Sequence, residues 1–439
     1  MLVTHAIDMS RRAALTSVAA GALSLSMPAS SATQSTPPYP EPGSPIRAVR
    51  VGSPTAIADS VGDTWVTAWG DDGALYSPSN DTRGFHSDAL IFRLLSDLTV
   101  DQKRRIQSGD VSVWKELTAE QYAKLKREGP LSPIAFNRID GTDPLSMDGV
   151  TVNWMHEYSQ QDRGIREVVD HFGKKMKVAA DARTWKSSGC TFVDRSIYWV
   201  IARQQYGEIS GDTRLRQTAV GASLIKSTDY GKTWTRSAEE NMAMPMFPGS
   251  QFAAPYFVDY GRDRPPVDGA DRFVYAVSNN GFWDNGDRLI LGRVRRDRIG
   301  LLRSEDWEFF AGFDNSHSPA WTSLASSAKP VLQAPGRLGE SGVTYLPARG
   351  RYMLIGWYYP AGSGKLSGAH AHTIWDFYES PKPWGPWIKI GSRAWSPEGY
   401  YCPCICAKFQ SASRVYVVTA GDYTTSTLYR FTVVPIDIA

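Results

Sequence analysis

The sequence predicts an all-β protein, a five-bladed β-propeller with a small helical insertion in its first blade. Three observations lead to this prediction. A two-strand pattern recurs five times, the gaps between the copies are unequal, and one hairpin motif typical of propeller blades lies within the third-strand region of the second copy. Four-stranded units around an axis have this repeat structure, and insertions in single blades explain the unequal gaps better than a large β-sandwich does.

The repeated pattern is a short strand of small and apolar residues, a polar turn, and a strand rich in aromatic and β-branched residues. The pairs are 55–59 with 64–69, 189–194 with 197–202, 254–259 with 272–277, 342–346 with 351–357, and 404–408 with 414–419. A third strand is expected after most copies, at 222–226, 289–294, 372–378 and 427–431. Five copies predict five blades.

One segment between the predicted strands is helical in pattern. Residues 97–130 are highly charged and carry apolar side chains at helical spacing, for example Val113, Leu117, Tyr122 and Leu125. We expect one or two surface helices there, and a further helix over 163–172.

The hairpin motif is Ser227–Trp234, which matches the Asp-box pattern S/T-x-D-x-G-x-T-W. Asp229 would accept backbone hydrogen bonds in a tight turn, Gly231 would take a conformation closed to other residues, and Trp234 would pack beneath. The motif supports the fold and carries no chemistry.

The N-terminal residues predict a targeting signal. Arg11 and Arg12 precede the uncharged stretch 13–27, and small residues follow, so residues 1–32 are typical of a twin-arginine signal peptide. Residues 33–48 form a Pro/Ser-rich spacer, and 49–439 form the propeller. We expect a secreted or cell-envelope protein, with no membrane contact in its mature form.

The composition excludes several classes of protein and of binding partner. The 439 residues include 48 basic and 45 acidic side chains, and this near balance excludes a nucleic-acid binder that works through a broad basic field. An apolar share of 42% excludes a disordered chain, and four cysteines are too few for a disulfide scaffold. A monomer is expected.

The candidate acid comes from the propeller geometry. The innermost strand of each blade lines the axis, so residues just before a first strand face the central funnel. Glu340 holds that place in the fourth copy, Lys186 in the second and Gln251 in the third. Partial burial would raise the pKa of Glu340 towards neutrality and make it a general acid. The alternative is a solvated loop carboxylate.

The second candidate is the pair Asp71 and Asp72, flanked by Trp69 and Tyr76. Asp-Gly is also a favoured hairpin turn, which is the alternative. Glycoside cleavage needs two carboxyl groups across one bond, and Asp71 or Asp72 with Glu340 would supply them. Platforms and donors for sugar binding are Trp69, Trp154, Trp283, Trp357, Lys186 and Arg203.

Histidines and further carboxylates suggest no metal site that we can assign. His156, His370 and His372 are candidate substrate-binding groups, and His370 with His372 would share one face of a strand, but a third ligand is not evident. Asp140 and Asp143 are candidate ligands of a structural calcium, but their spacing is not that of a known calcium loop. No cofactor is required.

The run Cys402-Pro-Cys404-Ile-Cys406 is unusual. Strand alternation would put three sulfurs on one side, in a spacing that zinc sites do not use. Buried thiols, a bridge to Cys190 and a thiol nucleophile all stay open.

Three segments resemble a known family. Gly62–Ser77, Ile134–Pro144 and Tyr378–Trp387 are similar to proteins grouped as domain of unknown function 4185, which include the endo-D-arabinanases of glycoside hydrolase family 183. The matches span roughly residues 50 to 435. The resemblance implies a five-bladed propeller and a carbohydrate-active enzyme with acidic catalytic groups. The resemblance implies that Asp71 and Asp72 are such catalytic groups. Glu340 stands at the position where the wider five-bladed clan has its acid.

The function that we predict is a secreted glycoside hydrolase that acts on an arabinan-like polysaccharide. Asp72 would be base or nucleophile, Asp71 its partner and Glu340 the acid. A polysaccharide lyase would instead depend on Lys186, Arg203, His156 and Tyr256. In a non-catalytic sugar-binding propeller, the aromatic side chains would matter and the carboxylates would not.

Overall fold

A computed structural model describes most of the chain. The described residues are 45–108, 110–159, 165–169, 175–181, 183–206, 217–237, 244–262, 264–360, 372–396, 399–421 and 428–439. The predicted signal peptide and His370 lie outside these residues. Within them, no helix is both long and apolar enough to cross a membrane.

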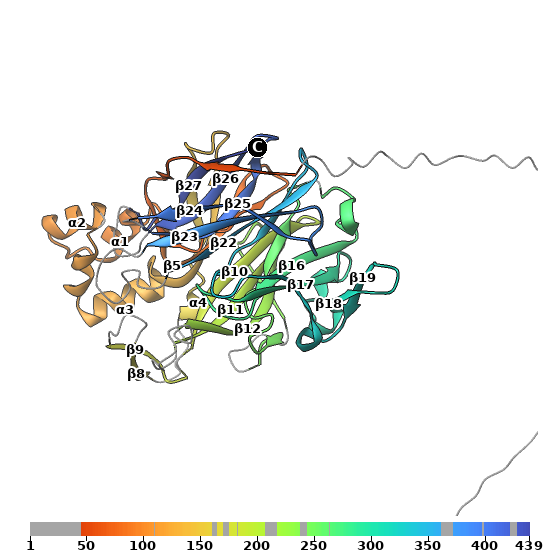
Figure 1. Ribbon diagram of the computed structural model, residues 1–439. Helices are drawn as coiled ribbons and strands as arrows, with labels where there is room; N and C mark the ends of the chain where they lie inside the picture. Colours follow the sequence, from red (N-terminus) through yellow and green to blue (C-terminus); the bar gives the residue numbers. More distant parts are fainter. Residues whose placement is uncertain are drawn as a thin grey trace, which may run out of the picture. The chain divides into compact units, whose positions relative to one another are not determined.

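The described strands form antiparallel sheets that follow one another along the chain (Figure 1). Blade 1 has β3 (Ser60–Asp63), β4 (Ala68–Trp69), β5 (Leu75–Phe85), β6 (Ser132–Asp140) and β7 (Asp148–Asn153). Blade 2 has β10 (Arg183–Val193), β11 (Ser196–Tyr206), β12 (Gln217–Ser227), β13 (Thr235–Arg236) and β14 (Phe247–Pro248).

The later sheets repeat this meander. Blade 3 has β15 (Tyr256–Asp259), β16 (Phe273–Asn279), β17 (Arg288–Arg295), β18 (Trp307–Phe313), β19 (Pro319–Thr322) and β20 (Pro330–Gln333). Blade 4 has β21 (Val343–Leu346), β22 (Arg351–Tyr358), β23 (Thr373–Ser380) and β24 (Ile388–Trp395). Blade 5 has β25 (Tyr400–Gln410), β26 (Arg414–Gly421) and β27 (Thr432–Ile438), completed by β1 (Val49–Val51) and β2 (Thr55–Ala56) from the start of the chain.

The first strands of these sheets contact one another in a closed ring. β4 contacts β10, β10 contacts β15, β15 pairs in parallel with β21, β21 contacts β25, and β25 returns to β4. A ring of this kind is the axis of a β-propeller, so the predicted all-β propeller fold is confirmed. We call the end of the sheets at which these first strands begin the leading end, and the opposite end the trailing end.

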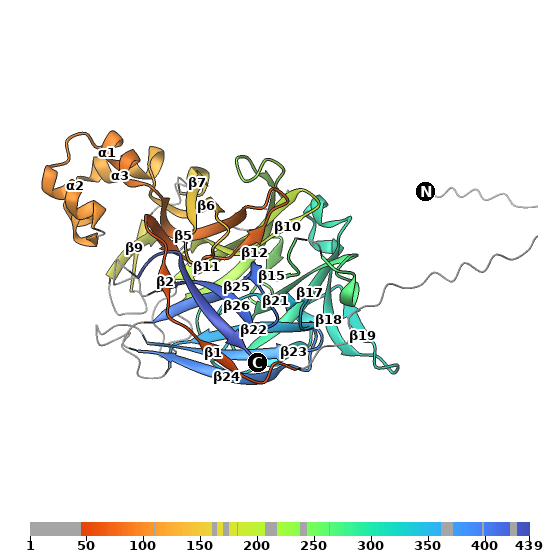
Figure 2. The ribbon, with the colours of Figure 1, turned by 90° about the horizontal axis from the view of Figure 1, so that it is seen from above.

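The helical insertion lies between β5 and β6, at the outer side of blade 1 (Figures 1 and 2). It contains α1 (Asp88–Leu94), α2 (Val100–Gln107), a 3₁₀ turn at Val111–Lys115 and α3 (Ala119–Glu128), so it begins earlier than predicted. α2 and α3 each start with a capping box, Thr99 with Gln102 and Thr118 with Gln121, which supplies partners to backbone groups that a helix start leaves open.

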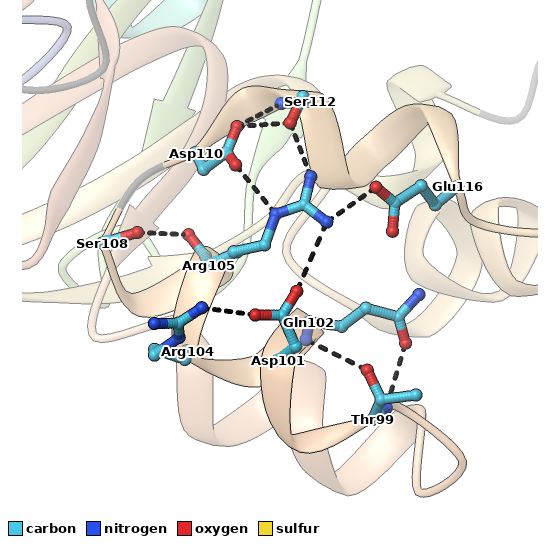
Figure 3. A network of polar contacts seen from close by, with 9 residues as sticks. All are labelled: Thr99, Asp101, Gln102, Arg104, Arg105, Ser108, Asp110, Ser112 and Glu116. Atoms are coloured by element: carbon cyan, nitrogen blue, oxygen red, sulfur yellow. Dashed lines mark hydrogen bonds and ion pairs between the residues drawn. The ribbon is translucent and has the colours of Figure 1, made fainter.

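The insertion has its own apolar core and its own ionic network. Ile91, Leu95, Ile106, Val113 and Leu125 are buried among its helices. In Figure 3 the Arg105 guanidinium reaches Asp110, Glu116 and Ser112, at 2.8, 2.7 and 2.6 Å. The insertion therefore packs as a small folded body against the blade.

Three predicted elements are wrong. Residues 163–172 do not form a helix where they are described, because Ile165–Val169 is strand β8, paired with β9 (Lys175–Ala179). The third strand predicted at 427–431 begins only at Thr432. In the first copy, β2 at 55–56 belongs to blade 5, and the stretch 60–69 supplies the first strand of blade 1 rather than its second.

The reason for the shifted first copy is the turn after Trp69. Gly70 donates its N–H to the carbonyl of Ala74 at 2.9 Å, and Gly73 has a φ of 85°, a left-handed conformation that favours glycine. This turn closes a hairpin between β4 and β5, so the true second strand is β5. The Asp-Gly pair thus lies at the trailing end of the blade.

Candidate active site

Carboxyl groups from blades 1 and 4 gather near the leading ends of the first strands. Asp63 ends β3, Asp81 lies in β5, Lys186 lies in β10, and Glu340 lies three residues before the start of β21. We call these four residues the carboxyl cluster. Asp63, Lys186 and Glu340 are buried, at 9%, 8% and 8% exposure, and burial of this kind requires partners for charged groups.

Lys186 is the shared cation of the cluster. Its Nζ forms an ion pair with the carboxylate of Asp81. The same ammonium lowers the pKa of both Asp63 and Glu340 by its charge, although in each case burial raises the pKa by more. One positive charge therefore acts on three acidic side chains, two from blade 1 and one from blade 4.

Glu340 has the properties of a general acid. Burial raises its pKa to about 8, Lys186 and the Tyr256 hydroxyl oppose this rise, and Asp284 adds to it. At neutral pH the carboxyl group is therefore mostly protonated and can donate a proton.

The backbone of Glu340 is held firmly by two tryptophans. Its N–H donates to the carbonyl of Trp283 at 3.0 Å, and the indole N–H of Trp357 donates to its carbonyl at 2.9 Å. At Gly339 a Cβ would meet the Trp357 ring at 2.5 Å, so glycine is needed for this close approach. The carboxyl group thus projects from a fixed backbone.

Asp63 is the second buried carboxyl group. Thr64 Oγ1 donates to its Oδ1 at 2.8 Å, and the Tyr401 hydroxyl donates to its Oδ2 at 3.0 Å. Burial and the charge of Asp81 raise its pKa to about 6, against the lowering effect of Lys186 and of these two hydroxyls. Asp63 is therefore mostly ionised at pH 7, where Glu340 is mostly neutral.

Asp81 carries backbone strain at this place. Its φ is 41°, in the left-handed region that a non-glycine residue seldom adopts. Strained residues persist where the surrounding structure holds them, and they gather at functional sites. Here the Tyr429 hydroxyl donates to the Asp81 carbonyl at 3.3 Å, and the side chain is directed to Lys186.

Aromatic rings lie beside Glu340. Trp283 packs edge-on against Trp357 and Tyr401, with ring centroids 5.1 and 5.6 Å apart. Trp357 is fully buried and supports the cluster from beneath, whereas Trp283 is only half-buried. Trp283 is therefore the predicted aromatic residue that can serve as a sugar platform.

The predicted pair Asp71 and Asp72 lies elsewhere. Asp72 accepts hydrogen bonds from the Tyr76 hydroxyl at 2.8 Å and the Ala74 N–H at 3.1 Å, and it forms an ion pair with Arg138. Burial raises its pKa, but these contacts outweigh burial and lower the pKa overall. Asp71 accepts from the Tyr230 hydroxyl at 3.1 Å, within the turn that begins at Ser227.

The strand register gives the separation of the two carboxyl groups of blade 1. Asp63 pairs with Asn80, and Trp69 pairs with Leu75, on the same strand β5. Five residues of a strand span about 17 Å, so the turn with Asp72 is at least that far along the blade from Asp63. The structure does not bring Asp72 together with Glu340, whereas it does bring Asp63 into the same charged cluster.

The remaining predicted binding residues divide between the two ends. Gln251 accepts from Arg288 at 3.1 Å, in the segment before β15, and His372 directly precedes β23. Trp69 is at the trailing end, where the Arg262 guanidinium lies 4.9 Å from its ring.

Two further predicted binding residues, Arg203 and His156, are in contact with other parts of the protein. Arg203 is fully buried, with its guanidinium 4.8 Å from the Trp185 ring, and His156 lies within hydrogen-bond distance of the Lys126 carbonyl, at 3.1 Å. Of the residues that a lyase would use, Lys186 belongs to the cluster, and the Tyr256 hydroxyl acts on the pKa of Glu340.

The cysteines and the predicted metal ligands take other roles. All four cysteines are buried free thiols, and burial raises the pKa of each. Asp140 is bound on both oxygens by Arg138, at 2.9 Å each. Across the described part of the chain, no group of three or more His, Cys, Asp or Glu side chains is arranged to hold a metal ion.

Sequence reasoning missed Asp63, and a signal for it was present. Gly62-Asp63-Thr64 directly precedes the aromatic stretch Trp65–Trp69, so the rule that identified Glu340 also applied to Asp63. The residue was overlooked because that stretch was assigned to the second strand of the blade.

The chain was compared with known proteins. No family model and no curated protein matches it. Similar solved structures include a presumed hydrolase from Bacteroides ovatus, with 13% identity, 87% of this chain and 86% of that chain covered, and a TM-score of 0.42. A GH32 β-fructofuranosidase of Bombyx mori has 8% identity, 90% and 60% coverage and a TM-score of 0.41.

A further similar structure is a xylan β-1,4-xylosidase from Bacillus halodurans. It has 9% identity, covers 89% of this chain and 54% of its own, and has a TM-score of 0.41. At such values the function has to be argued from the residues of the site itself.

Proposed function

We propose that this protein is a glycoside hydrolase that cleaves an arabinan-like polysaccharide with Glu340 as general acid and Asp63 as the opposing carboxylate. One observation carries the proposal. Two buried carboxyl groups from blades 1 and 4 share one ammonium, and their pKa values are raised to about 6 and about 8. Between these values one is ionised and the other protonated, which is the division of roles that glycoside cleavage requires.

The chemistry follows from this division. Glu340 donates its proton to the oxygen of the departing sugar, so that the leaving group departs as an alcohol. Asp63 faces the developing positive charge at the anomeric carbon and acts as base towards water or as nucleophile. Asp81 and Lys186 set the charge around Asp63, and Trp283 offers an apolar face to a sugar ring.

The experiment is a glycan panel read by chromatography of released oligosaccharides. We expect the protein to shorten arabinan or arabinogalactan, with xylan and levan as comparison substrates, and without new ultraviolet absorbance in the products, since a lyase would form an absorbing double bond. Glu340→Gln and Asp63→Asn should each lower the rate by about 100-fold or more. Asp72→Asn is the matched control and should stay within about threefold of the native rate.

Three results would contradict the proposal. Full activity of Asp63→Asn would remove Asp63 from the reaction, and a large loss in Asp72→Asn alone would return the chemistry to the trailing end of blade 1. If no glycan is shortened but several are retained on an affinity gel, the protein is a sugar-binding propeller instead.

Export is a separate part of the proposal and depends on residues 1–32 alone. Arg11 and Arg12 precede the uncharged stretch 13–27, as in twin-arginine signals. Replacing both arginines by lysine should retain the protein inside the producing cell, and fractionation of the culture measures this. Unchanged export of the double variant would contradict a twin-arginine route.

A further inference from the structure

A cavity lies beside the carboxyl cluster, between blade 1 and the helical insertion. Its volume is ≈ 300 Å³. Its polar lining includes Arg83, Arg430, Asp59, Asp88 and Gln107. No step of the proposed reaction uses this cavity.

The cavity holds charges of both signs. The Arg83 Nη1 lies 3.4 Å from the Asp88 carboxylate, a long ion pair, and its guanidinium lies 4.9 Å from the Trp114 ring. Burial lowers the pKa of Arg83 to about 10, and repulsion from Arg430 contributes. Burial also raises the pKa of Asp88, with a further rise from Asp59. Guanidinium donors and carboxylate acceptors therefore face one small space together.

This mixture selects a class of ligand. An anion would be repelled by Asp59 and Asp88, and a cation by Arg83 and Arg430. A sugar hydroxyl both donates and accepts hydrogen bonds, so a ring with several hydroxyls can use both kinds of group at once. Small-molecule sites begin at about 300 Å³, which suits a single sugar unit.

The position of the cavity connects it with the cluster. Val61 lines the cavity and lies two residues before Asp63, about 7 Å along the strand. Arg83 lies two residues after Asp81 on β5. Arg430 follows Tyr429, whose hydroxyl donates to the Asp81 carbonyl at 3.3 Å.

The insertion forms a prebuilt wall of this cavity. Ile106 and Gln107 at the end of α2 line it, and the same last turn of α2 carries Arg105, the centre of the ionic network in Figure 3. A wall that is already ordered lowers the entropic cost of binding.

We propose that this cavity is a subsite for one sugar unit of the polymer, away from the linkage that is cleaved. The inference rests on the proposed function, and it makes the helical insertion responsible for a preference for long chains over short glycosides.

The experiment blocks the cavity without touching the carboxyl cluster. Ala89 lines the cavity and is exposed, so Ala89→Trp fills the space from the surface of α1. Gln107→Trp does the same from α2. Val100→Trp is the matched control, because Val100 is 86% exposed on the same insertion and does not line the cavity. The substrates are the polysaccharide cleaved in the panel and the 4-nitrophenyl glycoside of its sugar.

We expect Ala89→Trp and Gln107→Trp to lower kcat/KM for the polymer at least tenfold and to leave the value for the nitrophenyl glycoside within twofold. Val100→Trp should match the native protein on both. Native kcat/KM for the polymer in both cavity variants, with folding verified by circular dichroism, would overturn the inference. So would an equal loss on both substrates, because the cavity would then have no role specific to long chains.

The failure of the proposed function would look different. If the native protein cleaves no member of the panel, retention on immobilised arabinan, arabinogalactan, xylan or levan becomes the readout. Retention that both cavity variants lose supports the subsite in a protein that does not hydrolyse sugar. No retention of the native protein on any of them overturns the subsite together with the proposed function.

Discussion

At the scale of single residues, the site depends on how burial and one ammonium divide two carboxyl groups. The pKa values of Glu340 and Asp63 are both raised above their usual range, to about 8 and about 6, because the effect of burial is larger than that of the Lys186 charge. Without this ammonium, the pKa of each buried carboxyl group would rise further. Lys186 thus keeps both groups within the range in which acid and base work near neutral pH.

The pH dependence of kcat/KM should be bell-shaped. Activity requires ionised Asp63 and protonated Glu340, so we expect it to fall below pH of about 6 and above pH of about 8. A pH profile on the cleaved polysaccharide measures both limbs. A profile that is flat from pH 5 to 9 would contradict these roles.

Tyr401→Phe should move only one limb. The Tyr401 hydroxyl donates to Asp63 at 3.0 Å and lowers its pKa, so its removal raises that pKa. We expect the acidic limb to shift to higher pH, by about half a unit or more, with the basic limb unchanged. Tyr359→Phe, in the same aromatic cluster, is the control. A shift of the basic limb alone would place Tyr401 beside the wrong carboxyl group.

Glu340→Gln should stabilise the fold at alkaline pH. A carboxyl whose folded pKa is about 8, above its usual 4.5, loses stability as pH rises from 4.5 through 8, because the unfolded chain ionises freely and the folded chain does not. The amide has no such loss. Thermal melts should show Tm higher than native by a few degrees at pH 9 and equal at pH 4. A lower Tm at pH 9 would show that the carboxylate is stabilised where it lies.

At the scale of elements, two features of blade 1 position the function. Its first strand is interrupted between β3 and β4, where Thr64 has a φ of 55° and the Trp65 indole donates to the Gly62 carbonyl at 3.0 Å. This interruption directs Asp63 to the cluster. The insertion after β5 then supplies one wall of the cavity beside it.

The rigidity of the insertion can be tested through Arg105. Its side chain contacts Asp110, Glu116 and Ser112, whereas its neighbour Arg104 forms an ion pair with Asp101 within the same helix. We expect Arg105→Met to make residues 97–130 more susceptible to limited proteolysis by about threefold or more, and Arg104→Met to have little effect. Equal cleavage of both variants would mean that the apolar core alone orders the insertion.

The sequence predicted strands best where their neighbours in the chain decide them. Gly189–Asp194 and Ile197–Ala202 lie within β10 and β11, since alternation and the turn between them are local signals. The first copy was misassigned because β2 pairs with β27, a partner almost four hundred residues away. The same misassignment left Asp63 out of the candidate residues, whereas Glu340 precedes a blade whose strands were assigned correctly.

At the scale of the whole molecule, the ring is closed by the start of the chain. β1 pairs with β27 through Val49 and Ile438, and Arg50 forms an ion pair with Asp437 at 2.6 Å. A ring closed in this way joins the first and last blades, and the cluster needs that closure because Asp63 and Tyr401 come from those two blades.

Removing the closing strand should therefore affect both stability and activity. We expect a chain that begins at residue 54 to melt several degrees below one that begins at residue 45, and to lose activity on the panel substrate. Scanning calorimetry and the chromatographic assay measure the two effects. Equal melting temperatures would show that β1 adds nothing to ring closure.

The central claim is that Glu340 and Asp63 flank one sugar linkage, and the leaving group tests it most directly. The dinitrophenolate group of a 2,4-dinitrophenyl glycoside departs without being protonated. The departing sugar of the natural polymer needs a proton from the general acid. We predict that Glu340→Gln lowers kcat/KM by about 100-fold or more on the polymer and by less than about tenfold on the dinitrophenyl glycoside. Asp63→Asn should lower kcat/KM on both substrates. Equal losses of Glu340→Gln on the two substrates, or full activity of Asp63→Asn on either, would contradict the account.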